Sequence, residues 1–274
     1  MRARRGRRTF VDEMCTRTSV ELAPDPELAV AAKVAIVAHF SQHSLVSLSM
    51  RRLVSELSSN GYRCIVVSTS PAGPLEWPDG VPPGTAVLRR ANEGYDFGSW
   101  AVGLELYPEA RRARHVILTN DSMAGPFEQI GPLLAAFESA PTDVWAVTDS
   151  HQLTHHLQSY FVGFNGGVLD ESPWRRFFRG VHHHEEKMDI VMRYELGLMR
   201  VCRTEGYPWT VQYRASDVGV GLENPTLAGW RQLLSLGFPF VKRTIITDPS
   251  TAPGGDQVAA VIRRKYGTEL SDWI

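Results

Sequence analysis

The chain has 274 residues, of which 43% are hydrophobic and 22% are charged, and its formal net charge is −1 at pH 7. Such a composition is typical of a globular protein with a sizeable core, and the near-zero charge argues against a nucleic-acid partner, which requires a basic excess. No apolar run approaches the roughly 20 residues that a bilayer-spanning helix needs.

The amino-terminal segment is strongly basic, with five arginines among residues 1–10. No apolar stretch follows, as a secretory signal would require. The three cysteines are widely spaced and fit neither a disulfide framework nor a metal site. We therefore expect a basic, flexible tail over residues 1–30 and a cytoplasmic location. Peripheral contact of the arginines with the inner face of a membrane is the alternative to a solvated tail.

From residue 31 onward, strand and helix patterns alternate. Apolar, β-branched runs predict strands, amphipathic repeats predict helices, and the Pro- and Gly-rich residues 71–84 predict a loop. The expected strands are Lys33–Phe40, Tyr62–Val67, Thr85–Leu88, His115–Leu118, Val144–Val147 and Leu157–Phe164. The expected helices are Leu45–Leu57, Phe97–Leu106, Phe127–Phe137, Lys187–Thr204, Pro225–Leu234 and Gln257–Tyr266.

This alternation is typical of βαβ units and predicts right-handed crossovers within a parallel sheet. The chain contains neither a GxGxxG fingerprint nor a GxxxxGK[ST] loop, which disfavours a dinucleotide-binding fold and a P-loop enzyme. We expect a single α/β domain over residues 31–274. Its sheet should be mixed, mostly parallel, flanked by helices and Rossmann-like.

The string Thr119–Ser122 follows the apolar run His115–Leu118. Ligands of open α/β sheets collect at the carboxyl ends of strands. Asp121 is therefore placed to hold a divalent metal or a sugar hydroxyl. The alternative is an aspartate that caps the next turn, because Asp and Ser readily bond nearby backbone donors.

A second polar string, Arg90–Trp100, lies upstream. Arg90 could clamp a diphosphate, Asn92 and Asp96 could bond ribose or sugar hydroxyls, and Gly94 would let the backbone approach the ligand. Together the two strings suggest a nucleotide-sugar site. The alternative for Asp96 is a cap on the helix that begins near Phe97.

Several strings together resemble the rhamnan synthesis protein F family, over about residues 33 to 248. The resemblance implies a GT-A-like fold that transfers sugars from nucleotide diphosphates in bacterial polysaccharide assembly. The matching strings are Val37–Phe40, Arg90 with Asn92–Trp100, Leu118–Ser122, Gly125-Pro126, His156–Phe161, Tyr194–Leu198, Asn224–Thr226 with Trp230, and Pro239–Lys242.

The resemblance implies that Asp121 is catalytic and holds Mg²⁺ or Mn²⁺ against the donor diphosphate. The usual DxD motif has two carboxylates, whereas Asn120-Asp121-Ser122 has one. Asn120 and Ser122 would contact the donor. Glu195 is the candidate base that deprotonates the acceptor hydroxyl. Its alternative is a surface glutamate paired with Lys187, Arg193 or Arg200.

The remaining candidates lie around the expected cleft. His39 would sit near the nucleotide base, and Lys242, with its neighbour Arg243, would reach the diphosphate. His156, Gln158 and Ser159 would face the acceptor, and each has a structural role as its alternative. The tract His182–Glu186 is expected to be an exposed loop, because adjacent side chains cannot all face one ion.

The sequence thus predicts a glycosyltransferase with a nucleotide-diphosphate sugar as donor and a polysaccharide or lipid-linked glycan as acceptor. Two alternatives stay open: a non-catalytic carbohydrate-binding scaffold with a degenerate transferase fold, and a sugar-nucleotide hydrolase.

Overall fold

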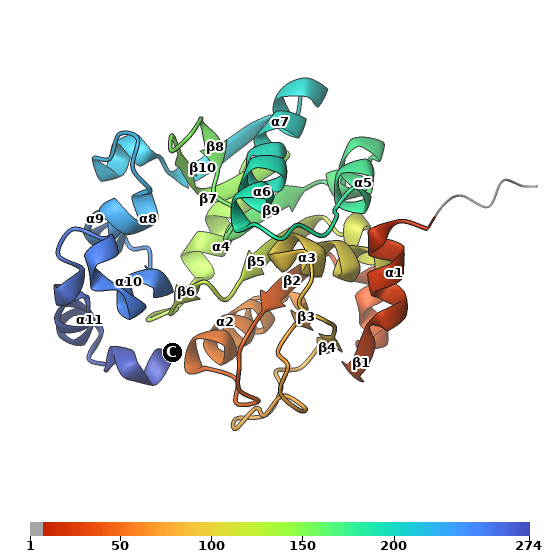
Figure 1. Ribbon diagram of the computed structural model, residues 1–274, viewed down its shortest axis with the longest axis horizontal. Helices are drawn as coiled ribbons and strands as arrows, with labels where there is room; N and C mark the ends of the chain where they lie inside the picture. The colour runs from red at the N-terminus through yellow and green to blue at the C-terminus, as the bar shows by residue number, and fades with distance from the viewer. Residues whose placement is uncertain (1–7) are drawn as a thin grey trace, which may run out of the picture.

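The computed structural model describes residues 8–274. They form a nine-stranded sheet with helices packed against it (Figure 1). The strand order is β1-β4-β3-β2-β5-β9-β7-β10, and β8 pairs with β7. β2, β3, β4 and β5 are mutually parallel, β9 runs antiparallel between β5 and β7, and β10 is parallel to β7. Six strands therefore share one direction, which confirms the predicted mixed, mostly parallel and Rossmann-like sheet.

The strands are β1 (Ser19–Leu22), β2 (Lys33–His39), β3 (Arg63–Ser68), β4 (Thr85–Arg89), β5 (His115–Asn120), β7 (Val144–Ser150), β8 (His156–Leu157), β9 (Phe161–Asn165) and β10 (Trp209–Tyr213). A separate pair is formed by β6 (Met123–Ala124) and β11 (Val241–Lys242). The longer helices are α1 (Phe10–Arg17), α2 (Leu48–Ser59), α3 (Tyr95–Leu106), α4 (Gly131–Glu138), α5 (Ser172–Arg179), α7 (Leu196–Glu205) and α11 (Val258–Tyr266).

Helices cover both faces of the sheet, which explains why the central strands are apolar along their whole length. In β2, Val34, Ile36 and Ala38 point to the face covered by α1, α3, α5 and α7. Ala35 and Val37 point to the opposite face, covered by α2 and α4. A third cluster joins the carboxy-terminal helices α9 (Trp230–Ser235), α10 (Arg243–Thr247) and α11 beside the β6–β11 pair (Figure 1).

The expected tail over residues 1–30 is corrected from residue 10 onward. Thr9 and Asp12 form a capping box that begins α1, and Val11 and Met14 are buried against α3. β1 then pairs antiparallel with β4. An unpaired β4 would be an exposed sheet edge, which proteins generally cover. Residues 1–7, which hold most of the expected arginine cluster, lie outside the described residues.

Several predicted elements differ in their limits. The expected strand Leu157–Phe164 is divided into β8 and β9, and the helix expected from Phe127 begins only at Gly131 as α4. The helix expected over Lys187–Thr204 contains α6 (Lys187–Ile190), a π-helical turn at Val191–Glu195, and α7. Residues 225–234 form α8 (Pro225–Ala228) and α9. No helix among residues 8–274 combines the length and the apolar character needed to cross a membrane.

Candidate functional site

Polar side chains gather where the parallel strands end. His39 ends β2, Ser68 ends β3 and Asn120 ends β5, while Arg90 follows β4. All four side chains are buried. Because the strands share one direction, these residues meet at the carboxyl edge of the sheet, where open α/β folds bind ligands.

The two polar strings singled out in the sequence are joined by hydrogen bonds at this edge. Asn120 Nδ2 donates to Asp96 Oδ2 at 2.7 Å. Asn120 Oδ1 accepts from Ser122 N–H at 3.1 Å and from Ser122 Oγ–H at 2.6 Å. Asn120 thus orients Asp96, at the start of α3, beside the 119–122 string.

Asp121 lies between Asn120 and Ser122 in the sequence, and its side chain is half-buried. Its Oδ2 accepts the backbone N–H of Phe40 at 2.9 Å, which ties the loop after β2 to the loop after β5. The other oxygen, Oδ1, has no hydrogen bond within residues 8–274 and is open to a ligand.

Asp96 is the second carboxylate of the site. Burial, together with the negative charges of Asp121 and Glu195, raises the pKa of Asp96 to about 7, against the opposing effects of the Asn120 hydrogen bond and Lys187. Asp96 and Asp121 are therefore close enough to repel each other. The single carboxylate of Asn120-Asp121-Ser122 has a partner contributed by another part of the chain.

Arg90 does not present a free guanidinium for the expected diphosphate clamp. Its N–H groups donate to the carbonyls of Ala91, Glu93 and Tyr95 and to Ser99 Oγ, at 2.6 to 3.3 Å. Burial lowers the pKa of Arg90 to about 10. All five of its donors are thus committed within the protein. Arg90 shapes the 91–95 turn and positions Asp96.

Gly94 and Gly98 are part of, or pack against, the same turn at residues 91–95. Gly94 precedes α3 with φ +73°, and a Cβ there would meet Phe10 of α1 at 3.5 Å. A Cβ on Gly98 would lie 2.6 Å from the carbonyl oxygen of Glu93. Gly94 is therefore suited to the left-handed backbone conformation before α3, whereas at Gly98 a side chain would collide with the turn.

The exposed members of the string are Ala91, Asn92 and Tyr95. Asn92 has no side-chain hydrogen bond within residues 8–274, so its amide remains available, as expected for a ligand-binding residue. Tyr95 has φ +51°, an uncommon conformation for a residue other than glycine. The sequence pattern gave no indication of this strained residue directly before Asp96.

Glu195 ends the π-helical turn and is only 19% exposed at its side chain. Its Oε1 accepts the N–H of Ser159 at 3.1 Å and lies 4.0 Å from His156 Nε2. Within residues 8–274, Glu195 forms no ion pair with Lys187, Arg193 or Arg200, which was the alternative to a catalytic role. Glu195 is thus a carboxylate whose orientation is fixed by the backbone N–H of Ser159. It also lies in a π turn, and such turns frequently occur at functional sites.

The residues predicted to face the acceptor divide into two groups. His156 is buried, and its Nδ1–H donates to the Thr154 carbonyl at 2.7 Å, so that Nε2 faces Glu195. Ser159 is half-buried and contacts Glu195. Gln158 is buried, and its amide bonds Thr148 at 2.7 Å and Asn224 at 3.1 Å. Both ends of the Gln158 side chain are therefore committed to structural contacts.

A hollow of about 690 Å³ is lined by His39, Phe40, Gln42, Ser47 and Arg243, among others. Asp121 does not line it, but accepts the N–H of Phe40 in its wall. The volume is in the range of small-molecule sites. His39 bonds Ser68 Oγ through Nδ1 at 3.0 Å, and burial lowers its pKa. Phe40 is 41% exposed, an unusual state for a large aromatic side chain at the end of a central strand.

Arg243 and Lys242 approach the site from β11 and α10. Arg243 N–H donates to the Ser122 carbonyl at 2.9 Å, and its Nη2 donates to Ser47 at 2.6 Å. Its buried Nε has no partner within residues 8–274. Burial lowers the pKa of Lys242, and nearby Glu195 opposes that shift. Arg243 is therefore the cation beside the hollow, which the sequence indicated only as a neighbour of Lys242.

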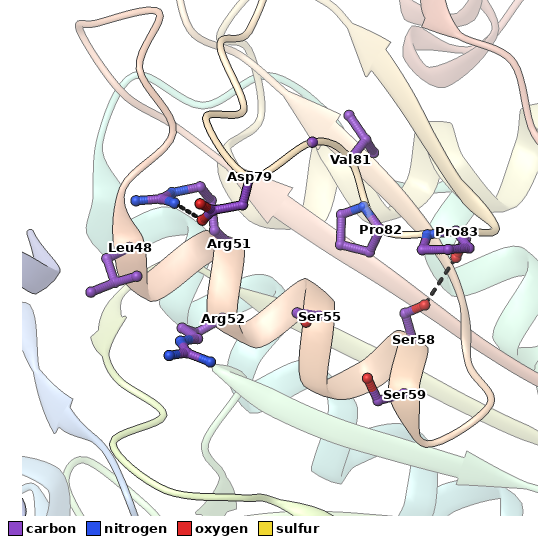
Figure 2. A pocket seen from close by; sticks show the side chains of 11 residues that line it. Leu48, Arg51, Arg52, Ser55, Ser58, Ser59, Asp79, Val81, Pro82 and Pro83 are labelled. Carbon is purple, nitrogen blue, oxygen red and sulfur yellow. Dashed lines mark hydrogen bonds and ion pairs between the residues drawn. The ribbon is translucent and has the colours of Figure 1, made fainter.

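A second large hollow, of about 700 Å³, lies away from these residues between α2 and residues 79–83 (Figure 2). Arg51 is ion-paired with Asp79 there, and Ser58 Oγ donates to the Pro83 carbonyl at 2.9 Å. None of the predicted site residues lines this hollow, and its one arginine–carboxylate pair is already formed. The hollow beside Asp121 is thus the better candidate for a functional site.

The chain is similar to known proteins over more than half of its length. It is 29% identical over 201 residues to virulence protein VirA of Vibrio anguillarum, covering 60% of this chain and 63% of VirA. It is 24% identical over 153 residues to protein y4gN of Sinorhizobium fredii, covering 54% of this chain and 40% of y4gN. The chain thus spans less than two thirds of the length of these relatives.

Residues 84–271 match the rhamnan synthesis protein F family. The match includes Asp96, Asp121 and Glu195, whereas the predicted string Val37–Phe40 lies before it. The chain therefore belongs to the rhamnan synthesis protein F family, a membership that suggests a role in polysaccharide synthesis.

Proposed function

We propose that the protein is a glycosyltransferase that moves a sugar from a nucleotide diphosphate to a hydroxyl of a polysaccharide or lipid-linked glycan. The observation that carries the proposal is that Asp121 bonds the N–H of Phe40, which lines the hollow of about 690 Å³, while Asn120 holds a second carboxylate, Asp96, at the same edge of the sheet. The family's role in polysaccharide synthesis supports the same reaction class.

The two carboxylates fit a divalent cation. Asp121 Oδ1 is free within the described residues, and Asp96 has a raised pKa because burial and Asp121 disfavour its negative charge. Oxygen ligands of this kind suit Mg²⁺ or Mn²⁺. Asp121 and Asp96 would hold the ion, which when bound supplies charge neutralisation for a leaving diphosphate.

The residues of the hollow would seat the nucleotide. Arg243 has an unpaired buried Nε and is the available cation for phosphate oxygens. The exposed ring of Phe40 could stack on a base, and Phe40 N–H holds Asp121 in place. Asn92, which is exposed, would bond the ribose or the sugar.

Glu195 would act as the base for the acceptor hydroxyl. Ser159 N–H holds one carboxylate oxygen, and His156 lies 4.0 Å away. Lys242 contributes positive charge near Glu195. A carboxylate held by the backbone keeps its orientation while it accepts a proton, which is what general-base catalysis requires.

Binding of nucleotides tests the donor half of the proposal. Melting temperatures would be measured with uridine, guanosine and thymidine diphosphates, each with and without MnCl₂. We expect one nucleotide to raise the melting temperature in a Mn²⁺-dependent way, because a ligand of the folded state stabilises it. Asp121→Asn should remove the shift, and Asp256→Asn, at an exposed position, should retain it. No shift with any nucleotide would contradict the proposal.

Transfer of labelled sugar from the matching donor to a rhamnose-containing oligosaccharide tests the second half. Glu195→Gln retains an acceptor for Ser159 N–H. We expect it to lower kcat by about 100-fold or more, in line with general-base catalysis, while Mn²⁺-dependent nucleotide binding persists. Equal turnover without an acceptor would favour the hydrolase alternative.

A further inference from the structure

A group of ligand-type side chains lies at the end of β7, and the proposed reaction makes no use of it. Asp149, His151 and His155 each offer one ligand atom, and the three atoms lie within 4.8 Å of one another. The imidazole rings of His151 and His155 are stacked, with centroids 4.6 Å apart and planes at 17°. Among residues 8–274, this is the one such group of three His, Cys, Asp or Glu side chains.

The aspartate of the group is fixed before any ligand arrives. Asp149 is 5% exposed, and its Oδ1 accepts the N–H of Ala215 at 2.7 Å. Its Oδ2 lies 2.9 Å from His155 Nε2. The histidines come from the connection between β7 and β8, so the group joins a rigid strand end to an exposed connection.

The spacing and the atom types fit a zinc-class ion. Zn²⁺ binds His nitrogen and Asp oxygen at about 2.0–2.2 Å, which places two ligands of a tetrahedral ion roughly 3.3 Å apart. The Asp149–His155 distance needs to lengthen by only a few tenths of an ångström, and the ion would replace the shared proton. Imidazole ligands favour Zn²⁺ over the oxygen-preferring Mg²⁺ or Mn²⁺.

We propose that Asp149, His151 and His155 bind Zn²⁺ or a similar borderline divalent ion, at a site distinct from the Asp96–Asp121 pair. Such an ion attaches residues 151–155 to the end of β7. The chain continues directly into His156 and Ser159, both of which approach Glu195. Metal binding therefore orders the segment that holds Glu195.

Arg203 competes with the ion. Its Nη2 lies 3.2 Å from His155 Nδ1, and because arginine only donates, Nδ1 is the acceptor and Nε2–H donates to Asp149. A histidine that binds metal through Nε2 carries its proton on Nδ1 and donates it to an acceptor. Arg203 must then turn away, which its exposed position permits. In Arg203→Gln, the amide oxygen could accept that proton.

Calorimetric titration of the full chain with ZnCl₂ tests the proposal. We expect one binding event to disappear in His155→Ala and in His151→Ala. The His151 side chain has no hydrogen bond within the described residues, so its loss should leave the fold intact. The event should persist in Asp121→Asn, which separates it from the diphosphate site. It should also persist in His183→Ala, a control in the exposed histidine tract. Arg203→Gln should tighten binding by about tenfold, the usual scale for outer partners.

Two outcomes would overturn the proposal. One is that both His151→Ala and His155→Ala bind zinc with the same stoichiometry and affinity as the unchanged protein. Asp149, His155 and Arg203 would then form only a chain of hydrogen bonds. The other is loss of the event in His183→Ala, which would place the ion in the histidine tract. A failed nucleotide-binding experiment would leave this result unaffected.

Discussion

The strings 90–98 and 119–122 lie side by side and contain the same kinds of residue, yet they do different work. In the first, Arg90 uses its donors on neighbouring carbonyls, Gly98 makes room for that turn, and Gly94 supplies its positive φ. In the second, Asp121 keeps one oxygen free beside a hollow. The first string builds the edge of the candidate site, and the second keeps bonding capacity that the proposed ligand would use.

The difference shows that residue type alone does not assign a role. An arginine and an aspartate beside the same cleft differ in how much bonding capacity remains after folding. Arg90 has none left, whereas Asp121 Oδ1 and Arg243 Nε do. Asp96 belongs to both groups, because Asn120 holds one of its oxygens while burial and the nearby charge of Asp121 raise its pKa.

The largest expected effect is on catalysis, in Asp121→Asn. The asparagine can still accept Phe40 N–H, so the free energy of unfolding should change by less than about 1 kcal/mol. Sugar transfer should fall by at least about 100-fold, the loss typical of one preorganised electrostatic contact. Transfer rates and urea unfolding would be measured together. A large loss of stability with transfer activity retained would show that Asp121 has a structural role and contradict its proposed catalytic role.

The next effect is on stability, in Arg90→Lys. An ammonium group cannot replace the five-donor network, and unsatisfied carbonyls would remain. We expect the free energy of unfolding to fall by about 2–4 kcal/mol, in the range for broken buried charged networks. Urea unfolding measures it, with Arg193→Lys, at an exposed position, as control. If stability were unchanged and nucleotide binding were lost, Arg90 would bind the diphosphate, as the sequence suggested.

A smaller effect concerns pH and Asp96. Since its pKa is about 7 in the folded protein, Mn²⁺ must displace a proton below that pH. Mn²⁺ affinity should therefore rise by up to about tenfold per pH unit between pH 5 and 7 and then level off. Titrations at several pH values would measure it. Asp96→Asn should bind more weakly with a flatter profile, and an equally steep profile in that variant would exclude Asp96.

The same raised pKa predicts the sign of a stability change without metal. The folded state holds the Asp96 proton more tightly than the unfolded state does, so this contribution is complete below the usual pKa of 3.8 and is lost as pH rises through about 7. Relative to Asp96→Asn, the protein should become less stable over that range, as chemical unfolding at each pH would show.

The smallest effect is expected in Asn92→Ala. Its amide is exposed and unpaired within the described residues, so stability should change by less than about 0.5 kcal/mol. Donor affinity should fall by about fivefold, equivalent to one hydrogen bond. Competition against a labelled nucleotide sugar would measure it. Unchanged affinity would show that Asn92 does not contact the donor.

The alternation of strands and helices was predictable because both faces of the sheet are buried, which makes its strands apolar and short. β10 was missed, because its residues are only partly buried and carry no strong apolar pattern. The amino-terminal helix and β1 were also missed, because a run of arginines conceals the short amphipathic repeat of Val11 and Met14.

The site was predictable in its position but not in its pairing. Asp121 follows a strand, and this local signal suffices to place it at the carboxyl edge. The contacts of Asn120 with Asp96, and of Glu195 with Ser159, span 24 and 36 residues and leave no periodic trace in the sequence. The bonding state of Arg90 likewise depends on a turn whose shape only the folded chain reveals.

The π turn at Val191–Glu195 has a consequence for alignment. A π turn holds about one residue more than an α turn, and each residue of a helix rotates the next by about 100°. Deleting one residue there would convert the turn to α-helix and move Glu195 to a different face, while the two flanking helices could keep their own contacts. Relatives with a one-residue gap in this segment should therefore lack a carboxylate at the position that bonds Ser159 N–H, even where the adjacent residues align.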